Sequence, residues 1–466
     1  MRPSGSQHPS NEQPPEAWEP LLRLVRLASR PVERFLRIEA ASGVLLLLAA
    51  AAALVWANSR WSEGYERLWL TPVAVRVGPY TFERDFLWLV NDGLMVVFFF
   101  VVGMEIRREL HHGELSDWRR AALPAAAALG GMIAPAALYL SLAGDPHLRS
   151  GWGVPMATDI AFAVGVLALL GRRVPPALRV LLLALAVIDD LGAIIVIAIF
   201  YSSRIALAGF VVAALGFAGI FAMQRFGVRR KVAYIAPAIV AWAGVYSAGI
   251  HPTIAGVIVG LATPVRAWLG REGLVAGIQS QLHRLTAPMS SEELTQSLRA
   301  LEAARREAVS PAESLIEALH PWVAYFIMPV FALANAGVRV SSTDFDPSSW
   351  RVLAAVAVGL VVGKPLGILF ACWLSVRLRV GALPKGVSLR HLIVLGVVAG
   401  IGFTMSLFIA QLAFRDPHVL AAAKLGVLTA SAAAGAIGLA LGRLLLSSQV
   451  SGALASADEA ESSTTS

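Results

Sequence analysis

The chain has 466 residues, of which 57% are hydrophobic and only 15% are Asp, Glu, Lys or Arg. A soluble globular chain carries about 25% charged residues, so this composition excludes an ordinary soluble protein and indicates that lipid surrounds most of the chain. The net charge of +8 gives no reason to expect a nucleic-acid partner, because basic residues between membrane spans are the usual orientation signal.

The first residues, 1–37, hold several Pro, Glu and Arg and are predicted to form a polar cytoplasmic arm. The apolar segments that follow predict membrane-spanning helices, each of which needs about 20 mostly apolar residues. The first lacks a convincing signal-peptide cleavage site and is interpreted as an uncleaved span. About twelve segments qualify, at approximately 40–59, 86–106, 121–143, 150–171, 178–201, 205–224, 232–249, 252–264, 321–338, 351–376, 391–413 and 418–442.

These segments predict an all-α polytopic membrane protein, with spans 1–8 in residues 38–264 and spans 9–12 in residues 321–446. The run 232–265 is too long for one ordinary span, so we divide it at His251-Pro252. Loops after even-numbered spans hold more than twice as many Lys and Arg as loops after odd-numbered spans. This bias predicts a bacterial inner-membrane protein with both termini in the cytoplasm.

Three segments are predicted to lie outside the membrane. The outer loop 60–85 contains alternating Val residues that could form a small hairpin. The cytoplasmic loop 265–320 contains Leu294, Leu298 and Leu301 at helical spacing among Glu and Arg, which predicts an amphipathic helix. The tail 447–466 is rich in Ser, Ala, Glu and Thr and is predicted to be disordered.

Five ionisable side chains fall within the predicted spans, where a charge costs roughly 3 kcal/mol or more and usually indicates function. Asp189 and Asp190 lie near the middle of the fifth span, Lys364 and Asp159 lie near the middle of theirs, and Asp92 lies closer to the outer end. The alternative is a structural ion pair. It is as good an interpretation for Asp92, and Lys364 could serve only as the partner of an aspartate.

The adjacent aspartates suggest a cation site. Neighbouring positions on a helix point about 100° apart, so Asp189 and Asp190 cannot grip one ion by themselves. One can face a cavity while the other faces a partner. Asp159 from another helix, with the Thr158 hydroxyl beside it, could complete an oxygen-lined site of the kind that hard cations prefer. A buried carboxylate that holds either a proton or a metal cation, but not both, is the physical basis of cation/proton exchange.

Two spans are predicted to be broken near the membrane centre. The fourth contains Pro155 and Thr158-Asp159, and the eleventh contains Gly400, Gly402 and Thr404. Unwound backbone at this depth is tolerated only where it lines a cavity or packs within protein. Each broken span is the middle helix of a three-span unit, which fits an inverted repeat with the two breaks crossing at the site. Ordinary close packing of Gly-rich helices is an equally good interpretation of these residues alone.

Seven strings along the chain resemble the NhaA family of sodium/proton antiporters. The inverted-repeat interpretation is not independent of this resemblance, because that family is a known example of the architecture. The similarity covers roughly residues 38–445. The strings are VNDGLMVVFFFVVGMEIRREL (90–110), PMATDIAFAVG (155–165), LALAVIDDLGAIIVIAIFY (183–201), SAGIHPTIAGVIVGL (247–261), LHPWVAYFIMPVFALANAGV (319–338), VGLVVGKPLGI (358–368) and AGIGFTMSLFIA (399–410).

The resemblance implies a transport site. Asp189 and Asp190 match the family's paired transport aspartates, with the second as the expected principal Na⁺ ligand. Asp159 and Thr158 match the residues of the unwound helix. Lys364 matches a buried lysine that is expected to pair with Asp189 or to offset a helix dipole.

The resemblance also implies how transport is driven and controlled. Family members expel Na⁺ or Li⁺ using the inward proton gradient, move more protons than sodium ions in each cycle, and are commonly homodimers; no cofactor is expected. Glu105, Glu109, His251 and His320 match positions linked to pH response, although both histidines are equally well explained as polar residues at helix ends. The loop 265–320 is longer and more charged than the usual family connection.

Three other functions fit the sequence less well. An intramembrane aspartyl protease needs two aspartates on separate facing helices, whereas Asp189 and Asp190 are adjacent. A cation channel needs a continuous pore, which broken helices and a buried lysine do not favour. A proton-coupled transporter of an organic solute needs recognition residues beside the acids, where this chain has only Leu, Ile, Ala and Val.

Overall fold

The computed structural model describes residues 41–78, 80–202, 206–267, 269–270, 275, 278–280, 290–339 and 346–446. The predicted arm 1–37 and tail 447–466 lie outside these residues, as does part of the predicted loop 265–320. By length and composition, eight helices of the described part can cross a membrane, or up to ten if each of two bent helix pairs is one span. The all-α polytopic fold is therefore confirmed, whereas the count of twelve spans stays a prediction.

Helices correspond to all twelve predicted spans, although several are shorter or divided. The α-helices are α2 Ala41–Ala57, α3 Ser62–Trp69, α4 Phe86–Trp88, α5 Met95–His112, α6 Trp118–Ala143, α7 Ile160–Leu169, α8 Pro176–Phe200, α9 Leu207–Arg225, α10 Ile235–Ser247, α11 Thr253–Ala262, α13 Ser291–Ala308, α14 Pro311–Trp322, α15 Met328–Asn335, α16 Pro347–Val358, α17 Lys364–Arg377, α18 Leu389–Ala399, α19 Phe403–Ala413 and α20 Pro417–Leu445. The 3₁₀ and π segments are η1 Leu89–Leu94, η2 Glu114–Ser116, η3 Arg149–Met156, η4 Gly171–Arg173, η5 Lys231–Tyr234, η6 Val323–Ile327 and η7 Gly359–Gly363.

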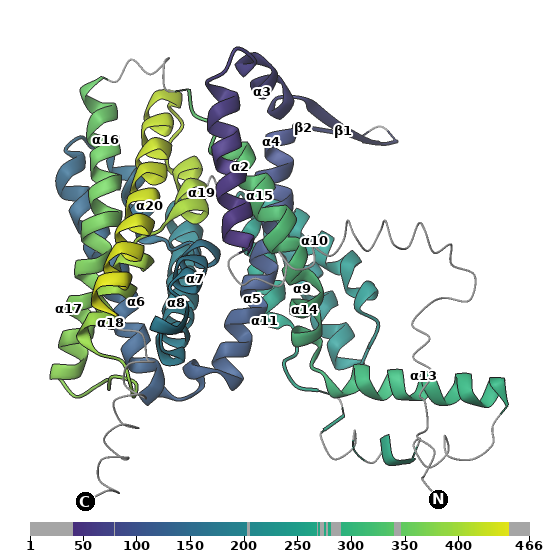
Figure 1. Ribbon diagram of the computed structural model, residues 1–466. Coiled ribbons are helices and arrows are strands. Elements are labelled where there is room, and N and C mark those ends of the chain that lie inside the picture. Colours follow the sequence, from purple (N-terminus) through teal and green to yellow (C-terminus); the bar gives the residue numbers. More distant parts are fainter. Residues whose placement is uncertain are drawn as a thin grey trace, which may run out of the picture.

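The helices form two groups (Figure 1). The core group contains α6, η3, α7, α8, α16, η7, α17, α18, α19 and α20, and the scaffold group contains α2, α5, α9, α10, α11, α14 and α15. Helices within each group pack closely because glycines let backbones touch: a Cβ on Gly130 of α6 would lie 2.2 Å from the carbonyl oxygen of Gly367 on α17. The close-packed pair α5 and α11 in the scaffold group meets in the same way at Gly103 and Gly260.

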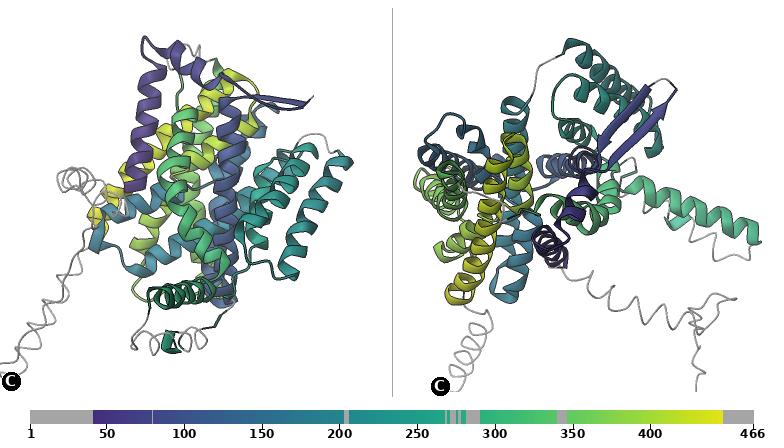
Figure 2. Two further views of the ribbon diagram at one scale, coloured as in Figure 1. Left: turned by 90° about the vertical axis from the view of Figure 1, so that its right-hand side faces the viewer. Right: turned by 90° about the horizontal axis from the view of Figure 1, so that it is seen from above.

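The segment 60–85, predicted as an outer loop, contains the predicted hairpin. Strands β1 (Pro72–Val77) and β2 (Tyr80–Asp85) pair antiparallel, and the hairpin projects from the bundle (Figure 2). Helix α3, which the sequence did not indicate, precedes it. Its buried Tyr65 donates a hydrogen bond of 2.8 Å to the Leu333 carbonyl, and its Trp69 stacks on Phe86 at 5.5 Å. These contacts tie α3 to α4 and α15 at the hairpin end of the bundle.

On the opposite side, helix α13 lies within the predicted cytoplasmic loop and extends away from the bundle (Figure 1). Its start follows the local sequence: Ser290 and Glu293 form a capping box, in which the Glu293 carboxylate accepts the Ser290 N–H at 2.8 Å. The helix that carries the predicted ninth span begins before residue 321, the predicted start of that span. Helix α14 begins at Pro311, because Ser310 caps it and Pro suits a first helical position.

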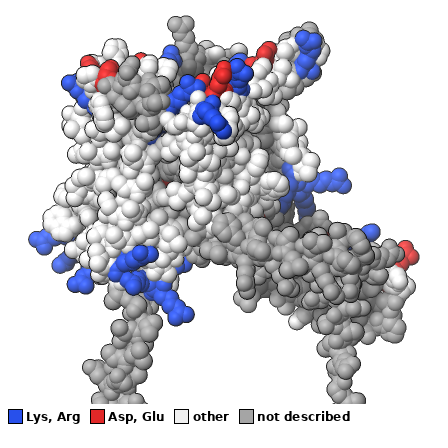
Figure 3. All heavy atoms as spheres, turned by 45° about the horizontal axis from the view of Figure 1, so that its top comes forward, with Lys and Arg blue, Asp and Glu red and all other residues white. Residues whose placement is uncertain are grey.

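Charged side chains gather at the end that carries the hairpin and at the opposite end, near α13. In Figure 3 most of the visible Lys, Arg, Asp and Glu residues lie toward the two ends of the molecule, and a broad belt between them is largely uncharged. Acidic residues gather at the end that carries the hairpin, whereas the opposite end of the core group is basic. This distribution agrees with a membrane-spanning body.

Both predicted breaks are confirmed. The fourth span is a 3₁₀ segment, η3, followed by extended backbone at Ala157 and Asp159 before α7 begins. The eleventh is α18 and α19, bent by 45° around Gly400–Gly402. Within the described residues, three π segments (η1, η6 and η7) interrupt other spans, and they were not predicted. π-Helical turns often occur at functional sites, and here η1 contains Asp92 while η7 ends directly before Lys364.

Candidate functional site

The two breaks lie against each other in the core group, and Asp159 joins them. The Asp159 N–H donates to the Ile401 carbonyl at 2.7 Å. Its Oδ1 caps α7 by accepting the Phe162 N–H at 3.0 Å, and its Oδ2 accepts the N–H and hydroxyl of Thr404 at 3.1 and 2.5 Å. One carboxylate thus meets the positive N-terminal ends of two half-helices, each worth about half an elementary charge.

Further hydroxyl groups hold the unwound backbone. Ser406 donates to the Val154 carbonyl at 2.7 Å, and the Ser431 oxygen of α20 accepts the Phe403 N–H at 3.1 Å. Buried backbone groups freed by a helix break need such partners. Sequence reasoning missed both serines, because a serine in an apolar helix gives no sign of which backbone group it will face.

Lys364 lies at a negative, C-terminal half-helix end of the crossing. Its ammonium donates to the carbonyl of Met156, the last residue of η3, and to Asp189 Oδ2 at 2.6 Å. The Lys364 and Asp189 side chains are 0% and 1% exposed. The lysine therefore meets both the negative end of a half-helix and a buried carboxylate, so neither is left as an uncompensated charge.

The paired aspartates on α8 differ in their surroundings. Asp189 Oδ2 also lies 2.6 Å from the Thr158 hydroxyl, which lies 3.1 Å from the Ala399 carbonyl. Asp189 Oδ1 and Asp190 Oδ1 are buried and accept no hydrogen bond from any described residue. Buried polar atoms are nearly always hydrogen-bonded. The unpaired oxygens of these two adjacent carboxylates therefore mark the position where a proton or a cation would satisfy them.

The predicted third carboxylate does not join them. In the part of the chain that the structure describes, no group of three His, Cys, Asp or Glu side chains is arranged to hold a metal ion. The reason is that both oxygens of Asp159 already serve the ends of α7 and α19. Asp159 and Thr158 are thus beside the paired aspartates, but in this structure Asp159 positions the breaks and only Thr158 touches Asp189.

The four predicted pH-response residues do not form one cluster. Glu105 on α5 interacts electrostatically with Asp190, and Glu109 lies near Arg108 and accepts the Glu114 N–H at 3.3 Å. His320 of α14 lies at this same end of α5, near Arg108. His251 lies toward the hairpin end, where its Nε2 is 3.3 Å from Asp92 Oδ1. Glu105 is therefore the member of this set that lies near the paired aspartates.

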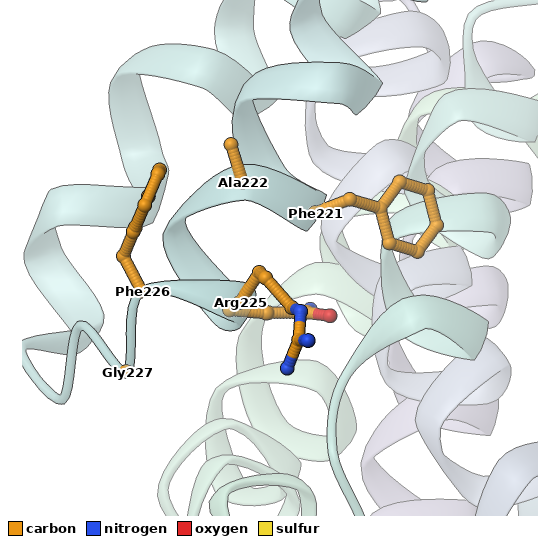
Figure 4. A pocket seen from close by; sticks show the side chains of 6 residues that line it. Phe221, Ala222, Arg225, Phe226 and Gly227 are labelled. Carbon is orange, nitrogen blue, oxygen red and sulfur yellow. The ribbon is translucent and has the colours of Figure 1, made fainter.

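Two other features escaped the sequence reasoning. Lys424 lies partly buried in α20, a further ionisable group within a membrane helix, and its position in an apolar run was a readable signal. A groove at the end of α9 (Figure 4) lies in the scaffold group, and none of the predicted transport residues lines it. Its lining residues are Phe221, Ala222, Gln224, Arg225, Phe226 and Gly227.

Comparison with known proteins gives a consistent result. The family described as Na⁺/H⁺ antiporter 1 matches residues 33–441. A protein of Myxococcus xanthus named Na(+)/H(+) antiporter NhaA 2 is 68% identical over 97% of both chains. Proteins of the same name from Sorangium cellulosum and Pseudomonas putida are 57% and 51% identical, over 97% and 91% of this chain and 98% and 95% of their own.

Proposed function

The chain belongs to the Na⁺/H⁺ antiporter 1 family, and on this premise we propose that it exports Na⁺ or Li⁺ in exchange for H⁺ that enters down its gradient. The exchange takes place at Asp189 and Asp190 in the bacterial inner membrane, with both termini in the cytoplasm. The observation that carries the proposal is the pair of buried, unpaired carboxylate oxygens on α8, one carboxylate of which is held by Lys364.

The geometry supports different roles for the two aspartates. Asp190 Oδ1 has no hydrogen-bond donor among the described residues, so a proton or Na⁺ is its natural partner. Asp189 keeps a free Oδ1 for a proton or a cation while its Oδ2 stays near Thr158 and Lys364. Both oxygen atoms are hard ligands suited to Na⁺. Because the cation and the proton need the same oxygens, each expels the other.

Charge balance makes the exchange electrogenic. A cation that draws Asp189 away from Lys364 leaves the ammonium to lose or share its proton, so more than one proton can be exchanged for each Na⁺. Net charge then moves inward, and the membrane potential contributes about 2.3 kcal/mol per charge for each 100 mV. We further propose pH regulation and a homodimer in the lipid bilayer, as the family resemblance implies.

Alternating access follows from the two helix groups. The site lies in the core group beside α5 of the scaffold group. Rocking of one group against the other would expose the paired aspartates to one side at a time. An aspartyl protease fits less well, because Asp189 faces Lys364 rather than a second aspartate on another helix.

Everted membrane vesicles test the proposal. Na⁺ or Li⁺ added to vesicles that carry a respiration-generated pH gradient should collapse the gradient, and K⁺ serves as the comparison ion. Asp190→Asn should abolish this response, whereas the matched control Asp145→Asn, which changes an exposed loop acid, should leave it unchanged. Full activity of Asp190→Asn would remove Asp190 as the ion site.

A further inference from the structure

One hydrogen bond joins the core group to the scaffold group in the outer half of the molecule. The Gln411 side chain of α19 donates to Asn335 Oδ1 at the end of α15. Asn335, which is fully buried, in turn donates to Asn91 Oδ1 at 2.8 Å and to the Phe331 carbonyl at 3.0 Å. Three amide side chains from three interrupted spans therefore form one chain of hydrogen bonds.

One turn closer to the site, an aromatic side chain crosses the same boundary. Phe408 of α19 is buried among three rings of the scaffold group: Phe99 of α5 at 5.5 Å, Phe331 of α15 at 6.1 Å and His251 at 5.2 Å between ring centroids. Phe408 and Gln411 are three positions apart, so they project from one face of α19. Both side chains of this face enter the scaffold group.

These contacts lie between the paired aspartates and the outer surface. Helix α19 starts at the break, where Thr404 contacts Asp159, and Phe408 and Gln411 lie about 6 and 10 Å further along its axis. Their scaffold partners belong to the hairpin end of the molecule, since Tyr65 of α3 donates to the carbonyls of Leu333 and Ala334. By contrast, the hydrogen bond from Tyr139 to the Leu148 carbonyl lies within the core group.

We propose that Gln411, Asn335 and Phe408 form an outer latch that closes the ion site to the external side and must open in each transport cycle. The inference rests on the proposed function, because a latch has a purpose only in alternating access. A half-buried amide–amide bond and an inserted ring suit this role. The amides bond to each other when the groups meet and can be hydrated when the groups separate.

Thiol labelling tests the latch without measuring transport. Ile194 lies one turn outward from Asp190 on α8 and is 7% exposed. Ile194→Cys, made in a Cys372→Ser background because Cys372 is the free cysteine of the described chain, would be labelled by an impermeant maleimide added from the outer side. Gln411→Met keeps the side-chain length but removes the donor and leaves Asn335 Oδ1 unpaired. It should accelerate labelling about two- to tenfold, as expected for one buried hydrogen bond.

The matched control removes a buried hydrogen bond within the core group. Tyr139→Phe loses the bond of 2.8 Å to the Leu148 carbonyl and should not change the labelling rate. The latch is refuted if Gln411→Met is labelled at the parent rate, or if Tyr139→Phe accelerates labelling equally. Size-exclusion profiles of each variant show whether the protein remains folded.

A reducible cross-link provides the opposite perturbation. Gln411→Cys with Asn335→Cys, also in the Cys372→Ser background, places two thiols where the side chains now touch. Cross-linking should block cation-dependent gradient collapse, and a reductant should restore it. Normal transport by the cross-linked protein would also overturn the latch. If the unmodified protein shows no Na⁺, Li⁺ or K⁺ response at all, the proposed function fails, whereas the labelling result still decides whether this contact opens.

Discussion

Replacement of Lys364 by Met tests whether the buried ion pair stabilises the crossing of the two breaks. The Lys364 ammonium lies 2.6 Å from Asp189 Oδ2, and both side chains are at most 1% exposed. Met retains the length and much of the volume of Lys, so the change removes charge more than packing. The Asp189 carboxylate would then lie in the protein interior with the Thr158 hydroxyl as its one hydrogen-bond donor among the described side chains.

The expected effect is large because one buried charge loses its partner. Removal of one member of a buried pair costs about 3–5 kcal/mol. At about 2 °C for each kcal/mol in a large protein, the temperature of unfolding should fall by about 6–10 °C. Size-exclusion chromatography of the heated, detergent-solubilised protein measures this shift.

Two further variants distinguish the loss of charge from the loss of packing. The double variant Lys364→Met with Asp189→Asn carries neither charge and should recover most of the lost stability. Lys424→Met in α20 is the matched control, since no acid among the described residues acts on this lysine. It should shift the unfolding temperature little. If the double variant is as unstable as Lys364→Met alone, the loss comes from packing and the ion-pair argument is wrong.

Two further predictions concern packing and pH. Gly130→Ala should destabilise the protein by about 1–3 kcal/mol, because its Cβ would lie 2.2 Å from the Gly367 carbonyl oxygen, whereas Gly64→Ala, which meets nothing within 4 Å, should be nearly neutral in the same thermal assay. Asp346 caps α16, and hydrogen bonds from the Ser348 hydroxyl and the Ser349 N–H lower its pKa to about 2. The pKa of Asp346 in the folded protein lies below the unfolded value of about 3.9, so its contribution to stability is complete above pH 4 and is lost as the pH falls toward 2. Asp346→Asn should remove this part of the pH dependence of thermal unfolding. An unchanged dependence of the unfolding temperature on acid pH would contradict the assignment.

Local sequence patterns identified the breaks and the outer hairpin. Pro155 and the glycines at 400 and 402 predicted the unwound segments because Pro and Gly in the middle of a span allow the backbone to unwind. The alternating valines predicted β1 because strand periodicity is a local property. Helix α14, in the predicted ninth span, begins earlier than predicted. Charged residues interrupt its apolar stripe in 311–320, and only the cap at Ser310 marks its start.

The sequence predicted which residues belong to the site, but not how they are arranged. Asp189, Asp190, Asp159 and Lys364 stood out because an ionisable side chain in lipid has few tolerable roles. Their partners did not follow from the sequence. Asp159 was expected beside the cation, but the structure turns both its oxygens to the ends of α7 and α19, because two positive half-helix ends meet there only when the breaks cross.

The sequence by itself therefore determined the membrane-spanning class, the positions of the broken helices and the residues that carry charge into the bilayer, because hydropathy and backbone propensity act within a single segment. Only the tertiary structure decided which carboxylate meets Lys364, which joins the half-helices, and that Gln411 reaches Asn335. Those pairings depend on helices far apart in the chain, whose approach is set by small residues and side-chain packing between them. The sequence of one helix does not specify which helix packs against it.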